Sequence, residues 1–286
     1  MMALVKSINY WSYPGGLDAS LPIETFLQWA KEDGFEGVEL AISDGGILSL
    51  EVTEKQCLEW AKMAADLGLK TLSVASGIYW SYSLASPQAI DRVKAKEALK
   101  RMIHISSWLG AKTLLTIPGA VDIFFMPNRE VQSYDDVLNL ALEGLHAVLP
   151  NAKDHEVRLG IENVWNRFLL SPTEMAEFID AFDSPFIGAY LDVANVLPFG
   201  YPEQWLKILR NRIVGIHFKD YRRAVGTGEG FVDLLEGDVN WPEVMKAIDL
   251  IQYHGPVVAE MIPAYKHYPR VRVQNASHAM NAILKR

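Results

Sequence analysis

The sequence is almost devoid of cysteine. Cys57 is the single cysteine in 286 residues, so the chain can form no internal disulfide and no zinc site built from cysteine thiolates. Cys57 falls within a helical stretch, where we interpret it as a small apolar side chain. The lack of a disulfide framework fits a reducing compartment, and we expect a cytoplasmic location.

Long hydrophobic runs and targeting segments are missing too. No uninterrupted apolar stretch approaches the roughly 20 residues that span a bilayer. The N-terminal sequence MMALVKSINYWSYPGG becomes polar and glycine-rich too early for a signal peptide. Because the sequence has no low-complexity tract or long linker, we expect residues 1–286 to form a single domain.

Basic residues are in deficit. The chain has 27 Lys and Arg against 35 Asp and Glu, which gives a formal net charge of −8. This balance argues against nucleic acid or an anionic membrane as the main partner, although a local basic patch could lie under it. Half of the residues are apolar and 22% are charged, which is typical of a soluble globular protein.

Short β-branched or apolar runs alternate with longer stretches of helical periodicity. The predicted strands are Leu4–Tyr10, Gly37–Ala41, Lys70–Ala75, Lys112–Ile117, Val157–Glu162, Phe186–Asp192, Ile213–Lys219 and Pro256–Glu260. The predicted helices are Pro22–Asp33, Thr53–Leu67, Pro87–Leu109, Tyr134–Asp154, Ser171–Phe182, Pro202–Leu209, Trp241–Ile251 and Arg270–Leu284. Eight strand–helix units in strict alternation imply a parallel sheet, and we predict that it closes into a (β/α)8 TIM barrel. The alternative, an open doubly wound sheet, is disfavoured because no Gly-x-Gly-x-x-Gly follows the first strand.

Four ionisable residues end four consecutive predicted strands: Glu162, Asp192, His217 and Glu260. In a (β/α)8 barrel the carboxyl ends of the strands form the active-site face, so these side chains converge on one mouth. Three carboxylates in one place cannot all ionise without a cation. Three oxygen ligands and one imidazole are typical of a site for a hard divalent ion such as Mn²⁺, Mg²⁺ or Co²⁺. They are less typical of a zinc site, which is often rich in thiolates. The competing interpretation is a set of salt bridges with Lys219 and Arg223, which four residues in register make less attractive.

Five segments resemble a known family. They are GIENVWNRFLLSP (160–172), AYLDVANVL (189–197), GIHFKDY (215–221), EGDVNWPEV (236–244) and VVAEM (257–261). They are similar to the xylose-isomerase-like barrel superfamily, and within it to sugar 3-epimerases of the L-ribulose-5-phosphate and D-tagatose type. The resemblance implies a homo-oligomer, either a dimer or a tetramer, and a sugar or sugar phosphate as the small-molecule substrate.

The resemblance also implies one divalent metal ion, with Mn²⁺ as the first choice and Mg²⁺, Co²⁺ or Zn²⁺ as alternatives. Glu162, Asp192, His217 and Glu260 would be its ligands, and Glu162 and Glu260 would double as the acid/base pair. The chemistry is consistent, because inverting C3 of a ketose means removing a proton from one face and returning one to the other. A metal would stabilise the enediolate formed between these steps.

Substrate-binding residues are predicted around the same mouth. Arg223 fits the family's substrate-binding arginine, with Arg222 as a substitute, and the aromatic side chains of Trp11 and Trp165 would wall the pocket. Glu39 would bind substrate or orient the liganding histidine. Asn195 stands where the tagatose-type enzymes have a histidine, and Phe168-Leu169-Leu170 stand where they carry a glutamate, which weakens that substrate assignment.

The metal quartet alone leaves several activities open. A C3 epimerase of a ketose or ketose phosphate leads, and the alternatives are an aldose–ketose isomerase, an inosose-type dehydratase and a non-catalytic sugar-binding barrel. A nuclease of the same fold is disfavoured because His217 is the only histidine at a strand end. The glycine-rich segment 224–230 is interpreted as a lid, or as a phosphate-binding loop together with Arg222 and Arg223.

Overall fold

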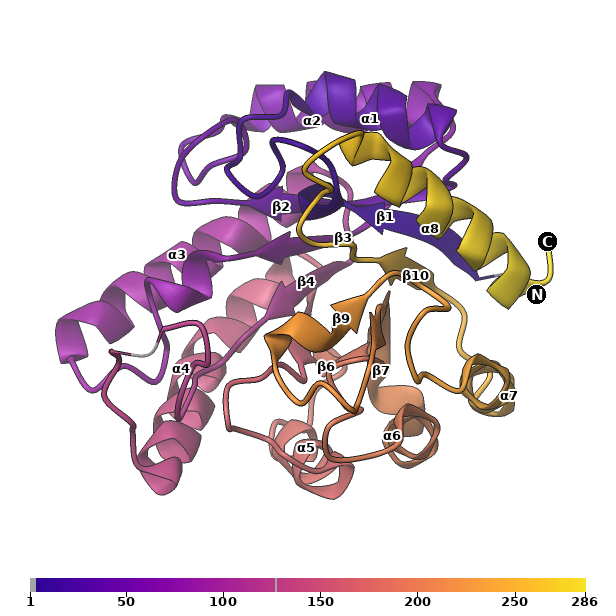
Figure 1. The fold of residues 1–286 in the computed structure, drawn as a ribbon. Helices are drawn as coiled ribbons and strands as arrows, with labels where there is room; N and C mark the ends of the chain where they lie inside the picture. Colours follow the sequence, from indigo (N-terminus) through magenta and orange to yellow (C-terminus); the bar gives the residue numbers. More distant parts are fainter. Residues whose placement is uncertain (1–3, 127) are drawn as a thin grey trace.

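The computed structural model describes residues 4–126 and 128–286. Eight parallel strands close into a barrel, and helices surround it (Figure 1). The barrel strands, in spatial order, are β1 (Val5–Asn9), β2 (Gly37–Ile42), β3 (Lys70–Ser76), β4 (Thr113–Thr116), β5 (Arg158–Glu162), β6 (Ile187–Asp192), β7 (Ile213–Phe218) and β10 (Pro256–Ala259). The helices are α1 (Ile23–Glu32), α2 (Glu54–Asp66), α3 (Ala89–Trp108), α4 (Tyr134–Asp154), α5 (Pro172–Asp180), α6 (Pro202–Leu209), α7 (Trp241–Leu250) and α8 (Pro269–Leu284).

The predicted (β/α)8 barrel is confirmed. Each predicted strand and helix is present, with its ends within one or two residues of the expected positions. The open doubly wound sheet is excluded because β1 pairs with both β2 and β10, which closes the sheet.

Prolines and capping residues explain where several of these helices begin. Pro172, Pro202 and Pro242 lie in the first turns of α5, α6 and α7, where proline's missing N–H costs no hydrogen bond. Thr53 and Gln56 form a reciprocal capping box that begins α2. Among the described residues, no helix has both the length and the apolar character needed to cross a bilayer.

Side chains alternate between the inside of the barrel and the helix layer. On β7, Phe218 packs against Trp241 of α7, with ring centroids 4.7 Å apart, so His217 points to the barrel interior. Gly215 faces the same interior: a Cβ there would lie 2.4 Å from the ring of Tyr190. Glycine at 215 therefore leaves room for a tyrosine inside the barrel, directly below the mouth.

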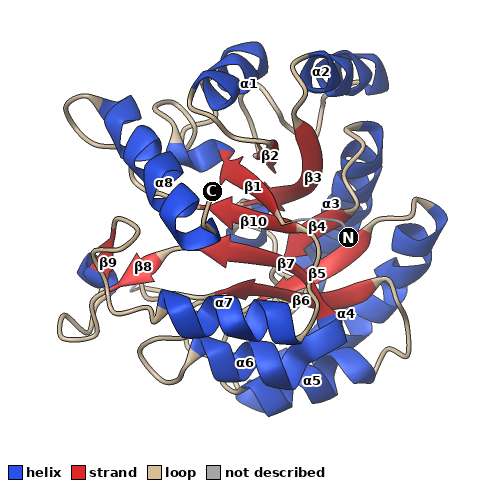
Figure 2. Ribbon diagram, turned by 90° about the vertical axis from the view of Figure 1, so that its right-hand side faces the viewer, coloured by secondary structure: helices blue, strands red, loops and turns tan. Residues whose placement is uncertain are grey.

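One small hairpin lies outside the barrel. It consists of β8 (Asp220–Tyr221) and β9 (Phe231–Val232), which pair antiparallel directly after β7. In Figure 2 the arrowheads of β1, β7 and β10 point toward the side of the molecule on which this hairpin lies. The hairpin was not predicted, because two-residue strands carry no readable periodicity.

Candidate active site

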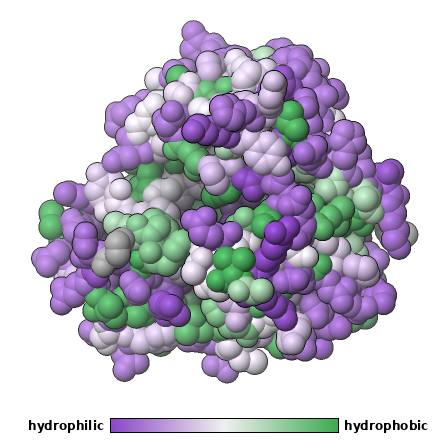
Figure 3. Space-filling view, viewed as in Figure 1, coloured by the Kyte–Doolittle hydropathy of each residue, from purple (hydrophilic) through white to green (hydrophobic). Residues whose placement is uncertain are grey.

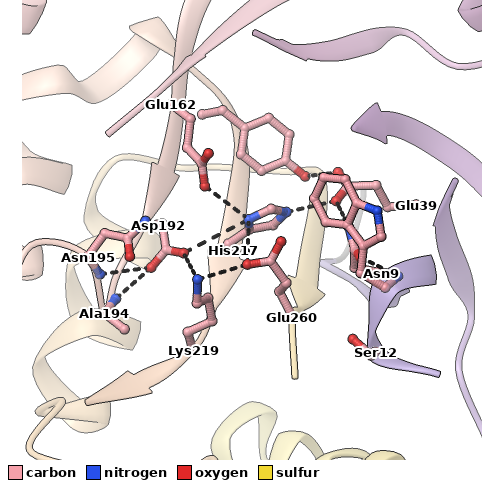
Figure 4. A network of polar contacts seen from close by, with 12 residues as sticks. Asn9, Ser12, Glu39, Glu162, Asp192, Ala194, Asn195, His217, Lys219 and Glu260 are labelled. Atoms are coloured by element: carbon pink, nitrogen blue, oxygen red, sulfur yellow. Dashed lines mark hydrogen bonds and ion pairs between the residues drawn. The ribbon is translucent and has the colours of Figure 1, made fainter. Parts of the chain in front are cut away.

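The four charged residues predicted at strand ends lie together (Figure 4). Glu162 is the last residue of β5, Asp192 is the last of β6, His217 is the penultimate residue of β7, and Glu260 follows β10. These strands are consecutive neighbours in the barrel, and the register pairs Asp192 with His217. All four side chains are buried. The closed sheet thus gathers them at one mouth.

His217 Nδ1 is the centre of this cluster. It lies 3.4 Å from Glu162 Oε1 and 4.0 Å from both Asp192 Oδ2 and Glu260 Oε2. Single ligand atoms of Glu162, Asp192 and His217 all fall within 4.8 Å of one another, which is close enough to hold one metal ion. Glu260 lies beside this triad and is not part of that compact group.

The donor atoms fit a divalent cation. Asp192 Oδ2 and His217 Nδ1 are buried and have no hydrogen-bond partner among the described residues. Asp192 Oδ1, by contrast, accepts hydrogen bonds from the backbone N–H groups of Ala194 and Asn195, both at 2.9 Å. Buried polar atoms are normally hydrogen-bonded, so two ligand atoms without a hydrogen bond on the adjacent strands β6 and β7 are consistent with a cation between them. Carboxylate oxygens and an imidazole nitrogen are suitable ligands for a divalent ion.

Glu39, on β2, holds the imidazole of His217 from below. Its Oε1 lies 2.7 Å from His217 Nε2 and accepts a hydrogen bond from Asn9 Nδ2 at 2.7 Å. Its Oε2 accepts from Ser73 Oγ at 2.6 Å and from the hydroxyl of Tyr190. Four partners leave Nδ1 of His217 turned toward the carboxylates. Glu39 is fully buried, so of its two predicted roles the geometry matches the orienting one and not direct contact with a substrate.

Lys219 lies inside the cluster of carboxylates, closer to them than its position in the sequence indicates. The competing interpretation of the quartet predicts salt bridges with Lys219, and its Nζ does lie 2.8 Å from Glu260 Oε2 and 3.3 Å from Asp192 Oδ2. The side chain is 12% exposed, and the ring of Phe231 on β9 covers the ammonium at 4.7 Å. The available signal was strand alternation, since residue 219 follows His217 by two and faces the same side.

Burial and charge make the two glutamates unequal. Burial raises the pKa of Glu162 to about 7; repulsion from Glu260 and Asp192 adds to this rise, and His217 opposes it. Burial also acts on Glu260, but the ammonium of Lys219 and the imidazole of His217 overcome it and hold the pKa of Glu260 below its usual value. Burial lowers the pKa of His217, yet the surrounding carboxylates, Glu39 first, hold it well above its ordinary value.

Three predicted substrate contacts lie around the mouth with specific partners. Asn195 donates from Nδ2 to the carbonyl of Asn163 at 3.0 Å, and Trp165 donates from Nε1 to the carbonyl of Asn195 at 3.0 Å. Trp11 is partly buried in the turn after β1 and packs against the core. These contacts fix Asn195 and Trp165 to each other and leave the aromatic faces to border the mouth.

Arg223 is directed away from the carboxylates. Its Nη2 donates to the carbonyl of Gly200 at 3.0 Å, and its guanidinium stacks 4.7 Å above the ring of Tyr201. Arg222 donates from Nε to the carbonyl of Glu236 at 3.0 Å. Among the described residues, neither arginine forms a hydrogen bond or ion pair with the candidate metal-binding triad, because both side chains anchor surface loops.

Aromatic rings form a continuous series along one side of the mouth. Trp80 contacts Phe125, Phe125 contacts Phe124, and Phe124 contacts Trp165, with centroid separations of 5.2, 5.2 and 5.4 Å. Trp165 then meets Phe231 at 4.9 Å. Figure 3 shows a hollow in this face, with both apolar and hydrophilic side chains around it. Such walls lower the local dielectric and suit a small ligand with apolar faces.

Comparison with known proteins gives a family match over most of the chain. The model of the xylose isomerase-like TIM barrel family matches residues 27–283. A putative L-ribulose-5-phosphate 3-epimerase of Escherichia coli K12 is 24% identical over 239 residues, which cover 81% of each chain. A 3-oxo-isoapionate decarboxylase of Pectobacterium atrosepticum is 25% identical over 175 residues, covering 57% of this chain and 62% of the relative.

Among solved structures, a D-psicose 3-epimerase crystallised in the presence of D-fructose superimposes with a TM-score of 0.78. The match covers 98% of this chain and 99% of that one, at 17% sequence identity. Similarity at this level of identity establishes a shared fold.

Proposed function

Because the chain belongs to the xylose isomerase-like TIM barrel family, we propose that it is a divalent-metal-dependent sugar epimerase. It inverts C3 of a ketose or a ketose phosphate. Glu162, Asp192, His217 and Glu260 bind the metal, and Glu162 and Glu260 are the acid/base pair. Mn²⁺ is our first choice of metal. The relative of Escherichia coli, whose name describes a ketose-phosphate 3-epimerase, supports the substrate class.

One observation carries this proposal: two buried glutamates flank the imidazole that would hold the metal. Figure 4 shows Glu162 and Glu260 on opposite sides of His217. Glu162 comes from β5 and Glu260 from the end of β10, so β6 and β7 separate them in the barrel. A substrate between these carboxylates would expose one face of its C3 to each. This is the arrangement that stereochemical inversion requires.

Each glutamate has a defined task in this scheme. A bound metal would polarise the ketone oxygen and so make the neighbouring C3–H more acidic. Glu260, which Lys219 keeps ionised, accepts the C3 proton from one face. Glu162 donates a proton to the opposite face, and the roles exchange in the reverse direction. The aromatic series beside the mouth limits access of water to the reacting carbon.

A decarboxylase is the second candidate, and the relative of Pectobacterium atrosepticum favours it. A 3-oxo acid loses carbon dioxide through the same kind of enolate that C3 deprotonation of a ketose gives. Polarisation of a ketone by a metal would serve both reactions, with one glutamate protonating the carbanion. The product, and not the ligand set, distinguishes the two.

The deciding experiment is NMR in D₂O with Mn²⁺-reconstituted or Mg²⁺-reconstituted protein. The substrates are ketopentoses, ketohexoses, their 5- or 6-phosphates and 3-oxo sugar acids. We expect deuterium at C3 together with formation of the C3 epimer. Exchange at C1 with an aldose product would identify an isomerase, loss of water a dehydratase, and release of carbon dioxide the decarboxylase. No reaction with any of these compounds would favour a binding protein.

Two variants test the acid/base pair. Glu162→Gln and Glu260→Gln should each lower kcat by at least about 100-fold, since each removes one proton-transfer group. Glu143→Gln, an exposed position on α4, is the control and should retain full turnover. Retention of turnover by either active-site variant would refute the assigned pair.

A further inference from the structure

Glu260 is the one predicted ligand that the compact triad leaves out, and Lys219 explains why. The ligand atoms of Glu162, Asp192 and His217 lie within 4.8 Å of one another. Glu260 Oε2 instead lies 4.0 Å from His217 Nδ1 and 2.8 Å from the ammonium of Lys219. Glu260 Oε2, which lies 4.0 Å from the candidate ligand atom His217 Nδ1, is also the oxygen that forms the ion pair with Lys219.

Lys219 also reaches into the triad. Its Nζ lies 3.3 Å from Asp192 Oδ2, the buried oxygen that has no hydrogen-bond partner in the described part of the chain. Lys219 and a metal would thus share two carboxylate oxygens, one from β6 and one from the end of β10. The ring of Phe231 covers the ammonium at 4.7 Å, which keeps water from screening its charge.

Charge balance shows what Lys219 adds to this buried site. The three carboxylates of the predicted quartet carry three negative charges, and the buried carboxylate of Glu39 behind the imidazole adds a fourth. A divalent ion and the ammonium of Lys219 would together offset three of the four charges, and the hydrogen bonds that Glu39 accepts stabilise the remaining one. The fixed ammonium also repels the metal and draws Glu260 away from it.

We propose that Lys219 is a positioning residue that competes with the metal for Glu260 and keeps this glutamate a weak fourth ligand, free to face the substrate. The inference rests on the proposed function only in taking Glu162, Asp192, His217 and Glu260 as the metal site. It predicts that Lys219 lowers the affinity of the protein for the metal and leaves Glu260 able to contact the substrate.

The test is the affinity of metal-free protein for Mn²⁺, measured by isothermal titration calorimetry without substrate. Lys219→Met removes the competing charge and should bind Mn²⁺ at least about tenfold more tightly than the wild type. Lys219→Gln keeps an N–H donor for Glu260 but no charge, and it should also bind more tightly. Lys246→Met, which removes an exposed charge on α7, should stay within about twofold of the wild type.

A double-mutant cycle with Glu260→Gln then isolates the competition. In the wild-type background Glu260 is shared, so Glu260→Gln should weaken Mn²⁺ binding by a few-fold. In the Lys219→Met background Glu260 is a full ligand, so the same change should cost about tenfold more. Circular dichroism and urea unfolding of each variant confirm that folded protein is compared, and Lys219→Gln serves if Lys219→Met does not fold.

The outcomes separate this inference from the proposed function. Unchanged or weaker Mn²⁺ binding by the neutral Lys219 variants, or equal effects of Glu260→Gln in both backgrounds, would overturn the role of Lys219 alone. Absence of Mn²⁺, Mg²⁺, Co²⁺ and Zn²⁺ binding by the wild type would overturn the proposed function and this inference together.

Discussion

At the residue scale, the imidazole of His217 depends on a carboxylate behind it. Glu39 Oε1 holds His217 Nε2 at 2.7 Å, and all four partners of Glu39 offer hydrogen-bond donors. In Glu39→Gln an amide NH₂ would face some of these donors, and the imidazole would lose its charged partner. We expect metal affinity to fall by about 10- to 100-fold, measured by calorimetric titration.

Ser73→Ala is the matched control for Glu39→Gln. Ser73 Oγ donates to Glu39 Oε2 at 2.6 Å and lies 3.2 Å from the hydroxyl of Tyr190, and it has no hydrogen bond to His217 in the described part of the chain. Its removal takes one hydrogen bond from the same carboxylate but leaves the imidazole held, so metal affinity should stay within about threefold. Equal losses in the two variants would mean that Glu39 acts by filling space and not by orienting the ring.

Protonation of His217 should set the pH dependence of the proposed metal binding. In the metal-free protein, the carboxylates around His217 outweigh burial and hold its pKa well above the ordinary value, so the ring is charged at neutral pH. A metal at Nδ1 displaces that proton, and affinity should therefore rise with pH by up to about tenfold per unit. Titrations at pH 7 in buffers of different ionisation enthalpy should reveal released protons, and an identical heat in all buffers would contradict this.

The same shift affects the stability of the metal-free protein with the opposite sign. A raised folded-state pKa means that the folded protein binds the proton more strongly than the unfolded chain does. This contribution is fully present below the ordinary histidine pKa and is lost as the pH rises through the folded-state value. Metal-free protein should thus lose stability toward alkaline pH, while excess metal should reverse the loss.

Some residue roles could be predicted from sequence and others could not. Glu162, Asp192, His217 and Glu260 were predicted to converge because a barrel brings strand ends together, and the structure brings them together. The contact between Glu39 and Tyr190 was out of reach, because it spans the barrel interior and depends on the space that Gly215 leaves. Arg223 was expected near the substrate, but its partners on the loop before α6 were not readable from spacing.

At the scale of elements, the alternation of strands and helices was predictable because apolar periodicity, N-terminal prolines and C-terminal glycines agree with one another. Gly34, Gly68 and Gly110, each just after a helix, have positive φ angles of 81°, 71° and 78°. The conformation of the connection from β7 to α7 was less predictable. It depends on hydrogen bonds to one side chain, Asp220, and not on a periodic pattern of apolar residues.

Asp220 organises this connection as a buried acceptor. Its carboxylate accepts hydrogen bonds from the N–H groups of Tyr221, Leu235 and Val239 and from the indole of Trp241, at 2.9 to 3.1 Å. Asp220→Asn replaces one acceptor with an NH₂ group that faces donors. We expect a loss of about 2–3 kcal/mol in the free energy of unfolding, measured in urea.

The control for Asp220 is its exposed neighbour in the same connection. Asp238 Oδ2 accepts one hydrogen bond, from the N–H of Arg223 at 2.8 Å. Asp238→Asn should cost less than about 1 kcal/mol, because water can replace that contact. Similar costs for the two variants would show that the buried carboxylate is not the organising group. The hairpin that carries Phe231 over Lys219 would then need another explanation.

At the scale of the whole molecule, the proposed metal site would join four consecutive strands of a closed barrel. Its candidate ligands come from β5, β6, β7 and the end of β10, and none comes from a separable lobe. A ligand that binds only the folded state raises global stability by RT ln(1 + [L]/Kd), or about 2.7 kcal/mol at 100 times Kd. For a chain of this size, Mn²⁺ should raise Tm by about 5 °C.

Measuring the rise in Tm with Mn²⁺ in variants shows where on the protein the metal binds. Glu162→Gln and Asp192→Asn each remove a ligand atom of the triad, so the rise in Tm on adding Mn²⁺ should largely disappear. Glu143→Gln lowers the charge of α4 without touching the site and should keep the full rise. If all three variants keep it, Mn²⁺ binds elsewhere on the acidic surface of this chain, whose net charge is −8. If only the triad variants lose it, Mn²⁺ binds at the buried site that includes Glu162 on β5 and Asp192 on β6, and that binding stabilises the barrel as a whole.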